Sequence, residues 1–200
     1  MDNIMNKRHK CFISFKMFDE EYKKYIQNVL SVDMIDKSLN EKINSQDPEY
    51  VMSVIRREYL KDSTVTIHLI GEKSSENHLF EDQYYIKKEL QASLTNSSHS
   101  RKSGILGVVL PEVEDKIYRG SNKCRTCGEN HNHVNIKDYT VKELSYNYYI
   151  PNDKCAWGPD DRYCVLVKWK DFIEKPNHYI DMAFEKRDAP ISTKTRVRPK

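Results

Sequence analysis

The segment that most constrains the fold is Thr64–Ile70 (TVTIHLI), a nearly continuous run of branched residues that ends at Gly71. A strand with one face in water alternates apolar and polar residues, whereas a continuous apolar run is typical of a strand covered on both faces. Such strands occur mainly in parallel sheets, because the connecting helices pack on both sides. The run therefore predicts a buried strand in an α/β protein.

Further segments have the character of buried strands. Three are short and rich in branched or aromatic residues: Lys10–Phe15 (KCFISF), Gly104–Leu110 (GILGVVL) and Tyr163–Trp169 (YCVLVKW). Val32–Ile35 (VDMI) is a weaker candidate. Together with Thr64–Ile70, these segments give an expected total of five strands.

Amphipathic helices are expected between these strands. In Asp19–Leu30, apolar residues recur every three or four positions, and the acids at its start suit the positive end of a helix dipole. Asp47 and Pro48 provide an N-cap and a first-turn proline for a helix that ends near Lys61. The three-to-four-residue period returns in two later segments, Asp82–Leu94 and Pro176–Arg187.

The alternation of strands and helices predicts a parallel sheet with helices on both faces. We expect a doubly wound, flavodoxin-like α/β fold with five strands in the order 2-1-3-4-5. In such sheets, ligands bind at the carboxyl ends of the strands, near the switch point between the first and third strands. A functional site is therefore expected just after KCFISF and TIHLIG.

The length of the chain, 200 residues, fits a single domain over residues 1–200. Residues 112–160 interrupt the alternation, because they are rich in Asn, Lys, Asp and Tyr and have no sustained period. We expect them to form an irregular, loop-rich insertion that leaves the sheet before the last strand. Residues 188–200 end in the basic sequence TKTRVRPK and are expected to be a flexible tail.

Charge and hydropathy argue against several kinds of partner. The 33 Lys and Arg nearly balance the 30 Asp and Glu, and a net charge of +3 is too small to indicate a nucleic-acid surface. No run approaches the roughly 18 to 20 apolar residues that span a bilayer, and no secretory signal is evident, so a cytoplasmic location without a membrane partner is expected. Neither GxGxxG nor GxxxxGK[ST] occurs, which argues against a standard Rossmann or P-loop site.

A cluster of metal-ligand residues lies in CRTCGENHNH, which contains Cys124, Cys127, His131 and His133. Two cysteines separated by two residues form the chelating half of many structural zinc sites, so these four residues are a candidate zinc site. Cys155 and Cys164 are alternative third and fourth ligands. Metal binding would supply folding energy to an insertion without a core. The other interpretations are reduced cysteines in a polar loop, or a transient disulfide.

An ordered set of elements in residues 8–110 resembles a known family. FISFKMFD stands at the end of the first strand, and DSTVTIHLIG contains the third. Tyr85 precedes Glu89 by four residues on the following helix, so both side chains share one helix face. With Asp36–Glu41 (DKSLNE), this set resembles the TIR-like domains of the bacterial Thoeris anti-phage defence system, the ThsB group. Tyr85 stands where that family usually has Trp.

The resemblance implies an NAD-consuming enzyme of the NAD glycohydrolase or ADP-ribosyl cyclase type. Such an enzyme cleaves the nicotinamide glycosidic bond and makes a cyclic or conjugated ADP-ribose signal, which diffuses to an effector. Glu89 would be the catalytic carboxylate. The residues implied to bind NAD are Phe12, Ser14, Phe15, Lys16, Asp19 and Tyr85. A homo-oligomer or an assembly with other TIR domains is a further implied partner.

One carboxylate is sufficient for this chemistry. Nicotinamide leaves from a positively charged state and needs no general acid, and the transition state resembles an oxocarbenium ion. A carboxylate beside the ribose stabilises that developing charge, especially where water is excluded.

Structural interpretations exist for the same residues. They are core packing for Phe12 and His68, a solvated cation for Lys16, a helix N-cap for Asp19, and a surface acid for Glu89. The alternative function is a TIR-like interaction or sensor module without catalysis, since a fold does not determine function.

Overall fold

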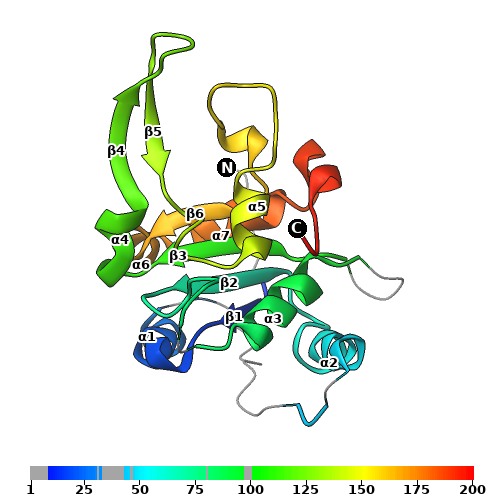
Figure 1. The fold of residues 1–200 in the computed structure, drawn as a ribbon. Coiled ribbons are helices and arrows are strands. Elements are labelled where there is room, and N and C mark those ends of the chain that lie inside the picture. Colours follow the sequence, from blue (N-terminus) through cyan, green and yellow to red (C-terminus); the bar gives the residue numbers. More distant parts are fainter. Residues whose placement is uncertain (1–8, 31, 33–42, 46, 80, 97–100) are drawn as a thin grey trace, which may run out of the picture.

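The computed structural model describes residues 9–30, 32, 43–45, 47–79, 81–96 and 101–200. Its centre is a four-stranded sheet in the order β1-β2-β3-β6, in which every neighbouring pair is parallel (Figure 1). The strands are β1 (Cys11–Ser14), β2 (Val65–Ile70), β3 (Gly104–Val109) and β6 (Val165–Lys168).

The predicted parallel α/β sheet is confirmed for these four strands, which lie in the relative order expected for strands one, three, four and five. The predicted second strand, Val32–Ile35, lies outside the described residues except for Val32, which is not in a strand. The fifth expected strand therefore lies, apart from Val32, outside the described residues.

The helices follow the predicted segments closely in the first half of the chain. The α-helices of the described residues are α1 (Glu20–Val29), α2 (Pro48–Val54), α3 (Tyr84–Leu94), α4 (Pro111–Ile117), α5 (Lys142–Tyr148), α6 (Trp169–Glu174) and α7 (Pro176–Glu185). Asp47 caps α2 by accepting a hydrogen bond from the Glu49 amide at 2.9 Å, and α2 continues through a π-helical turn at Ile55–Tyr59. None of these helices combines the length and apolar composition needed to cross a bilayer.

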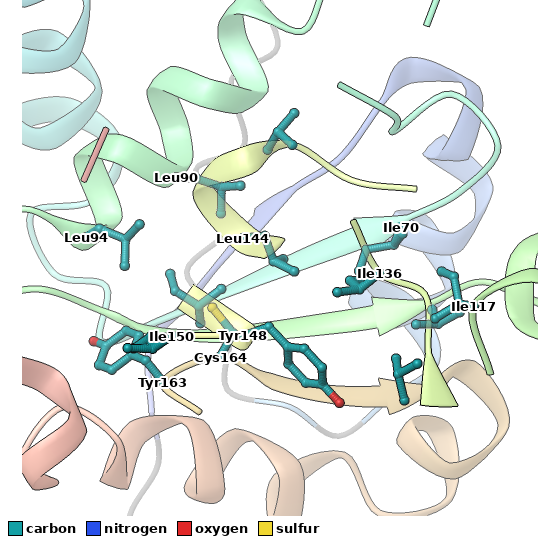
Figure 2. Close-up of a cluster of buried hydrophobic side chains, with 14 of the residues drawn as sticks. Ile70, Leu90, Leu94, Ile117, Ile136, Leu144, Tyr148, Ile150, Tyr163 and Cys164 are labelled. Carbon is teal, nitrogen blue, oxygen red and sulfur yellow. The ribbon is translucent and has the colours of Figure 1, made fainter. Parts of the chain in front are cut away.

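The sheet is covered on both faces, because alternate side chains of its strands enter two different apolar clusters. Ile70 and Val109 point to one side with Leu90 of α3 and Leu144 of α5. Leu69 and Leu106, and other residues of these strands, point to the opposite side, where α1, α6 and α7 pack. Figure 2 shows the first cluster, in which Tyr163 and Cys164 lie near Ile150. The double coverage also buries two polar side chains of β2, Thr66 and His68, whose hydrogen-bonding atoms find partners in Ser93, Ser14 and Thr140.

Residues 112–160 contain more regular structure than the sequence predicted. An antiparallel hairpin of β4 (Tyr118–Lys123) and β5 (Asn130–Val134) projects from the sheet (Figure 1). After it, Val141, Leu144 and Tyr148 are buried along α5 and join the main core. A helix of seven residues is too short to produce a sustained sequence period, which is why the segment resembled loop.

The basic tail also differs from its prediction, because it packs against the domain. A 3₁₀ turn at Pro190–Lys194 buries Ile191 in the core. The side-chain amide of Asn147 donates to the backbone carbonyl of Arg196 at 2.8 Å and accepts from its amide at 3.0 Å. These contacts hold the tail against α5, although its basic side chains remain at the surface.

Candidate functional site at the carboxyl ends of β1 and β2

The last residue of β1, Ser14, begins a buried polar network. It is paired in register with His68 of β2, and its Oγ lies 3.2 Å from His68 Nδ1. The other ring nitrogen, Nε2, lies 3.4 Å from the hydroxyl of Thr140. Complete burial lowers the pKa of His68 to about 4, so the imidazole is neutral at physiological pH. His68 therefore acts as a buried hydrogen-bonding residue of the sheet.

Glu89 lies beside Ser14, on α3, and only 5% of the residue is exposed. Burial raises the pKa of its carboxyl to about 8, while the hydrogen bond with Ser14 and the charges of Lys16 and Lys23 act in the opposite direction. Within the described part of the chain, Oε2 of Glu89 has no hydrogen-bond partner. Next to the last residue of β1 there is thus a buried carboxyl, one oxygen of which has no hydrogen-bond partner within the described residues.

When Glu89 is ionised, the single proton of the Ser14 hydroxyl fixes the direction of the network. If Ser14 donates to Glu89, it must accept from the Nδ1–H of His68, and Nε2 must then accept from Thr140. Thr140, His68 and Ser14 then each donate one hydrogen bond along the network. These neutral donors stabilise the ionised carboxylate of Glu89 without any of them becoming charged.

Asp19 provides a second buried carboxyl, with 3% of the residue exposed. It occupies the N-cap position of α1, yet its side chain makes no cap hydrogen bond. The carboxyl instead lies against Gly71 at the end of β2, and its Oδ2 has no hydrogen-bond partner among the described residues. Burial, reinforced by the negative charge of Glu112, raises the pKa of Asp19 to about 7, and Lys16 opposes that rise.

Two lysines influence these acids. Lys16 donates to the backbone carbonyl of Asp82 at 2.9 Å and forms an ion pair with Glu81 at 3.0 Å. Lys23, which is buried on α1, lies 4.7 Å from the centre of the Phe15 ring. The positive charges of both lysines lower the pKa of Glu89, and that of Lys16 also lowers the pKa of Asp19. Buried acids with perturbed pKa values of this kind cluster at functional sites.

The three aromatic residues implied to contact NAD have different surroundings. Phe12 is completely buried with Val51 and Ile55 of the α2 region, so it fills the core and offers no surface to a ligand. Tyr85 is partly buried and donates its hydroxyl to the carbonyl of Ile43 at 3.1 Å. Phe15 is partly exposed beneath Lys23.

Sequence reasoning missed several members of this arrangement. Lys23 follows Asp19 by four residues on α1, a spacing that could have indicated a shared helix face. In the sequence, Gly71 indicates only the end of a strand. Thr140 reaches His68 from the segment before α5, and its place in the sequence gives no signal of this contact.

The cysteine and histidine cluster differs in membership from the expected set. Ligand atoms of Cys124, Cys127, His131 and Cys155 lie within 4.8 Å of one another. His133 is not part of this group of described residues, and Cys164 is buried in the core. The fourth member is therefore Cys155, which was one of the alternatives.

No curated protein matches this chain. A crystal structure of YqhD from Escherichia coli K-12 is similar at 10% identity with a TM-score of 0.26, covering 96% of this chain and 58% of that one. A likeness at this level carries no conclusion about fold or function.

A family model described as the TIR-like domain of the Thoeris protein ThsB matches residues 12–115. The matched span begins in β1 and ends in α4, so it includes Ser14, Lys16, Asp19 and Glu89. It covers more than half of the 200 residues and three strands of the central sheet. The chain therefore belongs to the Thoeris ThsB family of TIR-like domains.

Proposed function

We propose that this chain is an NAD-consuming enzyme that releases nicotinamide and converts the remaining ADP-ribose into a signal for anti-phage defence. The observation that supports the proposal most strongly is the environment of Glu89. Its carboxyl is buried at the carboxyl end of the sheet, accepts from Ser14, and keeps one oxygen without a partner within the described residues. Doubly wound folds bind ligands at this end of the sheet, where the carboxyl ends of the strands lie.

The raised pKa of Glu89 fits a cationic substrate. Without a ligand, a pKa of about 8 leaves the carboxyl mostly protonated at neutral pH. The positively charged nicotinamide ring of NAD would favour ionisation of a carboxyl close to it. The resulting carboxylate would then stabilise the oxocarbenium-like transition state in an environment that excludes water. No general acid is required, because nicotinamide departs as a neutral molecule.

Two further groups have suitable chemistry for the rest of the substrate. Oδ2 of Asp19 lacks a partner within the described residues and could accept a hydrogen bond from a ribose hydroxyl. Lys16 forms an ion pair with Glu81, whose side chain is partly exposed, and a phosphate group could replace this partner. Lys16 would then neutralise substrate charge while Asp19 orients the sugar.

The burial of Glu89 also bears on the product. Hydrolysis requires a water molecule at the reacting carbon, whereas transfer requires another nucleophile in its place. A site that excludes water favours transfer of ADP-ribose to an internal or external acceptor. We therefore expect a cyclic or conjugated ADP-ribose product that activates a separate effector protein.

A non-catalytic interaction module is the second candidate function, and one surface feature favours it. Met17 and Phe18 lie in the 3₁₀ turn directly after β1 and are 69% and 67% exposed. Exposed apolar side chains next to each other are typical of protein contact surfaces. The same pair could support assembly of TIR domains around a catalytic site, so turnover decides between the two functions.

The experiment compares metabolites of phage-infected cells that express the native chain or a variant. Mass spectrometry should detect NAD loss and an ADP-ribose-derived product with the native chain, and neither with Glu89→Gln. Glu143→Gln is the matched control, because Glu143 is likewise buried on a helix and has one oxygen without a partner among the described residues, but it belongs to α5 and accepts from Gln91 at 2.7 Å instead of from Ser14. Defence that persists in Glu89→Gln without NAD loss would favour the interaction module.

A further inference from the structure

The turn of the projecting hairpin has the backbone arrangement of a metal-binding knuckle. Cys124 directly follows β4, and its Sγ accepts a hydrogen bond from the Thr126 amide at 3.4 Å. The Gly128 amide donates to the carbonyl of Cys124 at 3.0 Å, and Gly128 adopts a φ of +80°, which favours glycine. This turn directs the thiols of Cys124 and Cys127 toward the same side.

Two side chains from other parts of the chain complete the group. Nε2 of His131, on β5, lies 3.1 Å from the Cys127 sulfur. The same nitrogen lies 3.5 Å from the sulfur of Cys155, which comes from the segment after α5. All four ligand atoms lie within 4.8 Å of one another. Three thiols and one imidazole thus surround a single point.

These separations agree with tetrahedral zinc coordination. Bonds of about 2.3 Å to sulfur and about 2.0 Å to nitrogen require neighbouring ligand atoms to be roughly 3.5 to 3.8 Å apart. Small movements of exposed side chains would adjust the present distances to these values. We propose that Cys124, Cys127, His131 and Cys155 bind one structural Zn²⁺ ion.

The position of His133 explains why it is left out. It follows His131 by two residues on β5, so both side chains point to the same face of the strand. Two residues of strand extend over roughly 6.6 Å, which exceeds the edge of a zinc tetrahedron. The third sulfur ligand comes from Cys155 because the chain returns beside the hairpin.

A metal ion would provide what the hairpin lacks in apolar contacts. Five of the six residues in β4 are exposed, so little burial holds this arm in place. The segment that carries Cys155 is fixed at its other end, where the indole of Trp157 donates to the Ile150 carbonyl at 2.7 Å. Coordination would tie the arm to this segment and stabilise both.

The bonds from these four residues to the metal ion would also fix one wall of a large cavity. A cavity of about 1130 Å³ lies between the hairpin and the segment after α5, and Cys124, His131 and Cys155 contribute to its lining. Zinc with four protein ligands has no open position, so its role is structural rather than catalytic. Binding converts three thiols to thiolates and releases three protons, which leaves the site with a charge of −1.

The first test uses the full chain purified under reducing conditions and dialysed without chelator. One Zn²⁺ ion per chain should be measured, and replacement by Co²⁺ should give the intense visible absorption of a tetrahedral thiolate site. Removal of zinc should expose three thiols to a thiol reagent, because Cys11 and Cys164 are buried in the core. A native chain that binds no zinc, or whose Co²⁺ form lacks the thiolate bands, would overturn the proposal.

The second test compares the zinc affinity of three variants, measured in competition with a chelator. Cys155→Ser and His131→Asn should each lower zinc affinity by at least tenfold, while His133→Asn should keep the native affinity. If Cys155→Ser fails to fold, the comparison of His131→Asn with His133→Asn still decides. Equal zinc affinity of these two histidine variants would contradict the assigned ligands. None of these measurements depends on NAD turnover.

Discussion

The carboxyl of Asp19 occupies the space next to Gly71, so that a Cβ atom at position 71 would lie 2.4 Å from Asp19 Oδ1. Real Cβ atoms do not approach oxygen so closely. Glycine at the end of β2 is therefore required by this close approach, and it allows a buried acid from the start of α1 to reach the edge of the sheet. The same contact explains why Asp19 does not cap its own helix.

Gly71→Ala should displace Asp19 and destabilise the domain. Overpacking in a buried site costs about 1 to 3 kcal/mol of unfolding free energy. Urea denaturation followed by circular dichroism measures this cost. Gly158→Ala is the control, because its Cβ would come no closer than 3.5 Å to Asp161 Oδ2, an ordinary contact. Equal stability of the two variants would show that Asp19 does not fill the space beside Gly71.

Glu89→Gln should alter how stability depends on pH. The pKa of Glu89 is raised from its ordinary value of 4.5 to about 8, so the folded state retains a proton that the unfolded state has lost between these values. The protonated Glu89 carboxyl contributes fully to the stability of the fold below about pH 4.5. This contribution is lost as the pH rises to about 8, by up to about 1.4 kcal/mol of unfolding free energy per pH unit. The variant should lack this decline.

Thermal or urea unfolding from pH 5 to pH 8 provides the measurement. Asp19→Asn should remove a second, similar decline, because burial raises the pKa of Asp19 to about 7. Parallel pH profiles of native protein and Glu89→Gln would mean that Glu89 is ionised throughout this range and is not desolvated as described.

Ser14→Ala should shift the pH dependence of NAD cleavage to more alkaline values. The hydrogen bond with Ser14 lowers the pKa of Glu89, so its loss raises the pH at which the reactive carboxylate forms. The pH profile of kcat/KM reports groups of the free enzyme and is the appropriate measurement. An unchanged profile with a lower plateau would assign Ser14 a role in substrate contact alone.

Tyr163→Phe tests how the residue pair just before β3 and β6 holds these two strands together. The Tyr163 hydroxyl donates to the Ser103 carbonyl at 2.7 Å, and both residues are buried. Removing the donor leaves a buried carbonyl without its partner, which costs about 1 to 3 kcal/mol. Tyr50→Phe, at a half-exposed position, should change the unfolding free energy by less than about 0.5 kcal/mol. A difference no larger than this in Tyr163→Phe would indicate that the hydroxyl finds another partner.

The central sheet could be predicted because its strands are short, apolar and bounded by polar segments. The sequence VTIHLI indicates a buried strand, and all six of its residues are buried in β2. The short helix α5 could not be predicted in this way, since Leu144 and Tyr148 form only one repeat of its apolar period. Its burial depends on tertiary contacts with the sheet.

The candidate sites show the same limit. Ser14 and Glu89 are far apart in sequence, and the resemblance to the ThsB family, together with the expected site at the strand ends, is what links them to one ligand. The space that Gly71 leaves for Asp19 depends on exact side-chain positions. The approach of Cys155 to His131 depends on the path of an irregular segment, which no local pattern specifies.

Nicotinamide release from NAD by the purified full chain, measured over a range of protein concentrations that permits self-association, tests the role of Glu89 most directly. The native chain and Glu143→Gln should release nicotinamide, and Glu89→Gln should lower the rate by at least about a thousandfold, as expected when a charge-stabilising group is lost. Release by Glu89→Gln at the native rate, or none by the native chain at any concentration, would contradict the proposed catalysis.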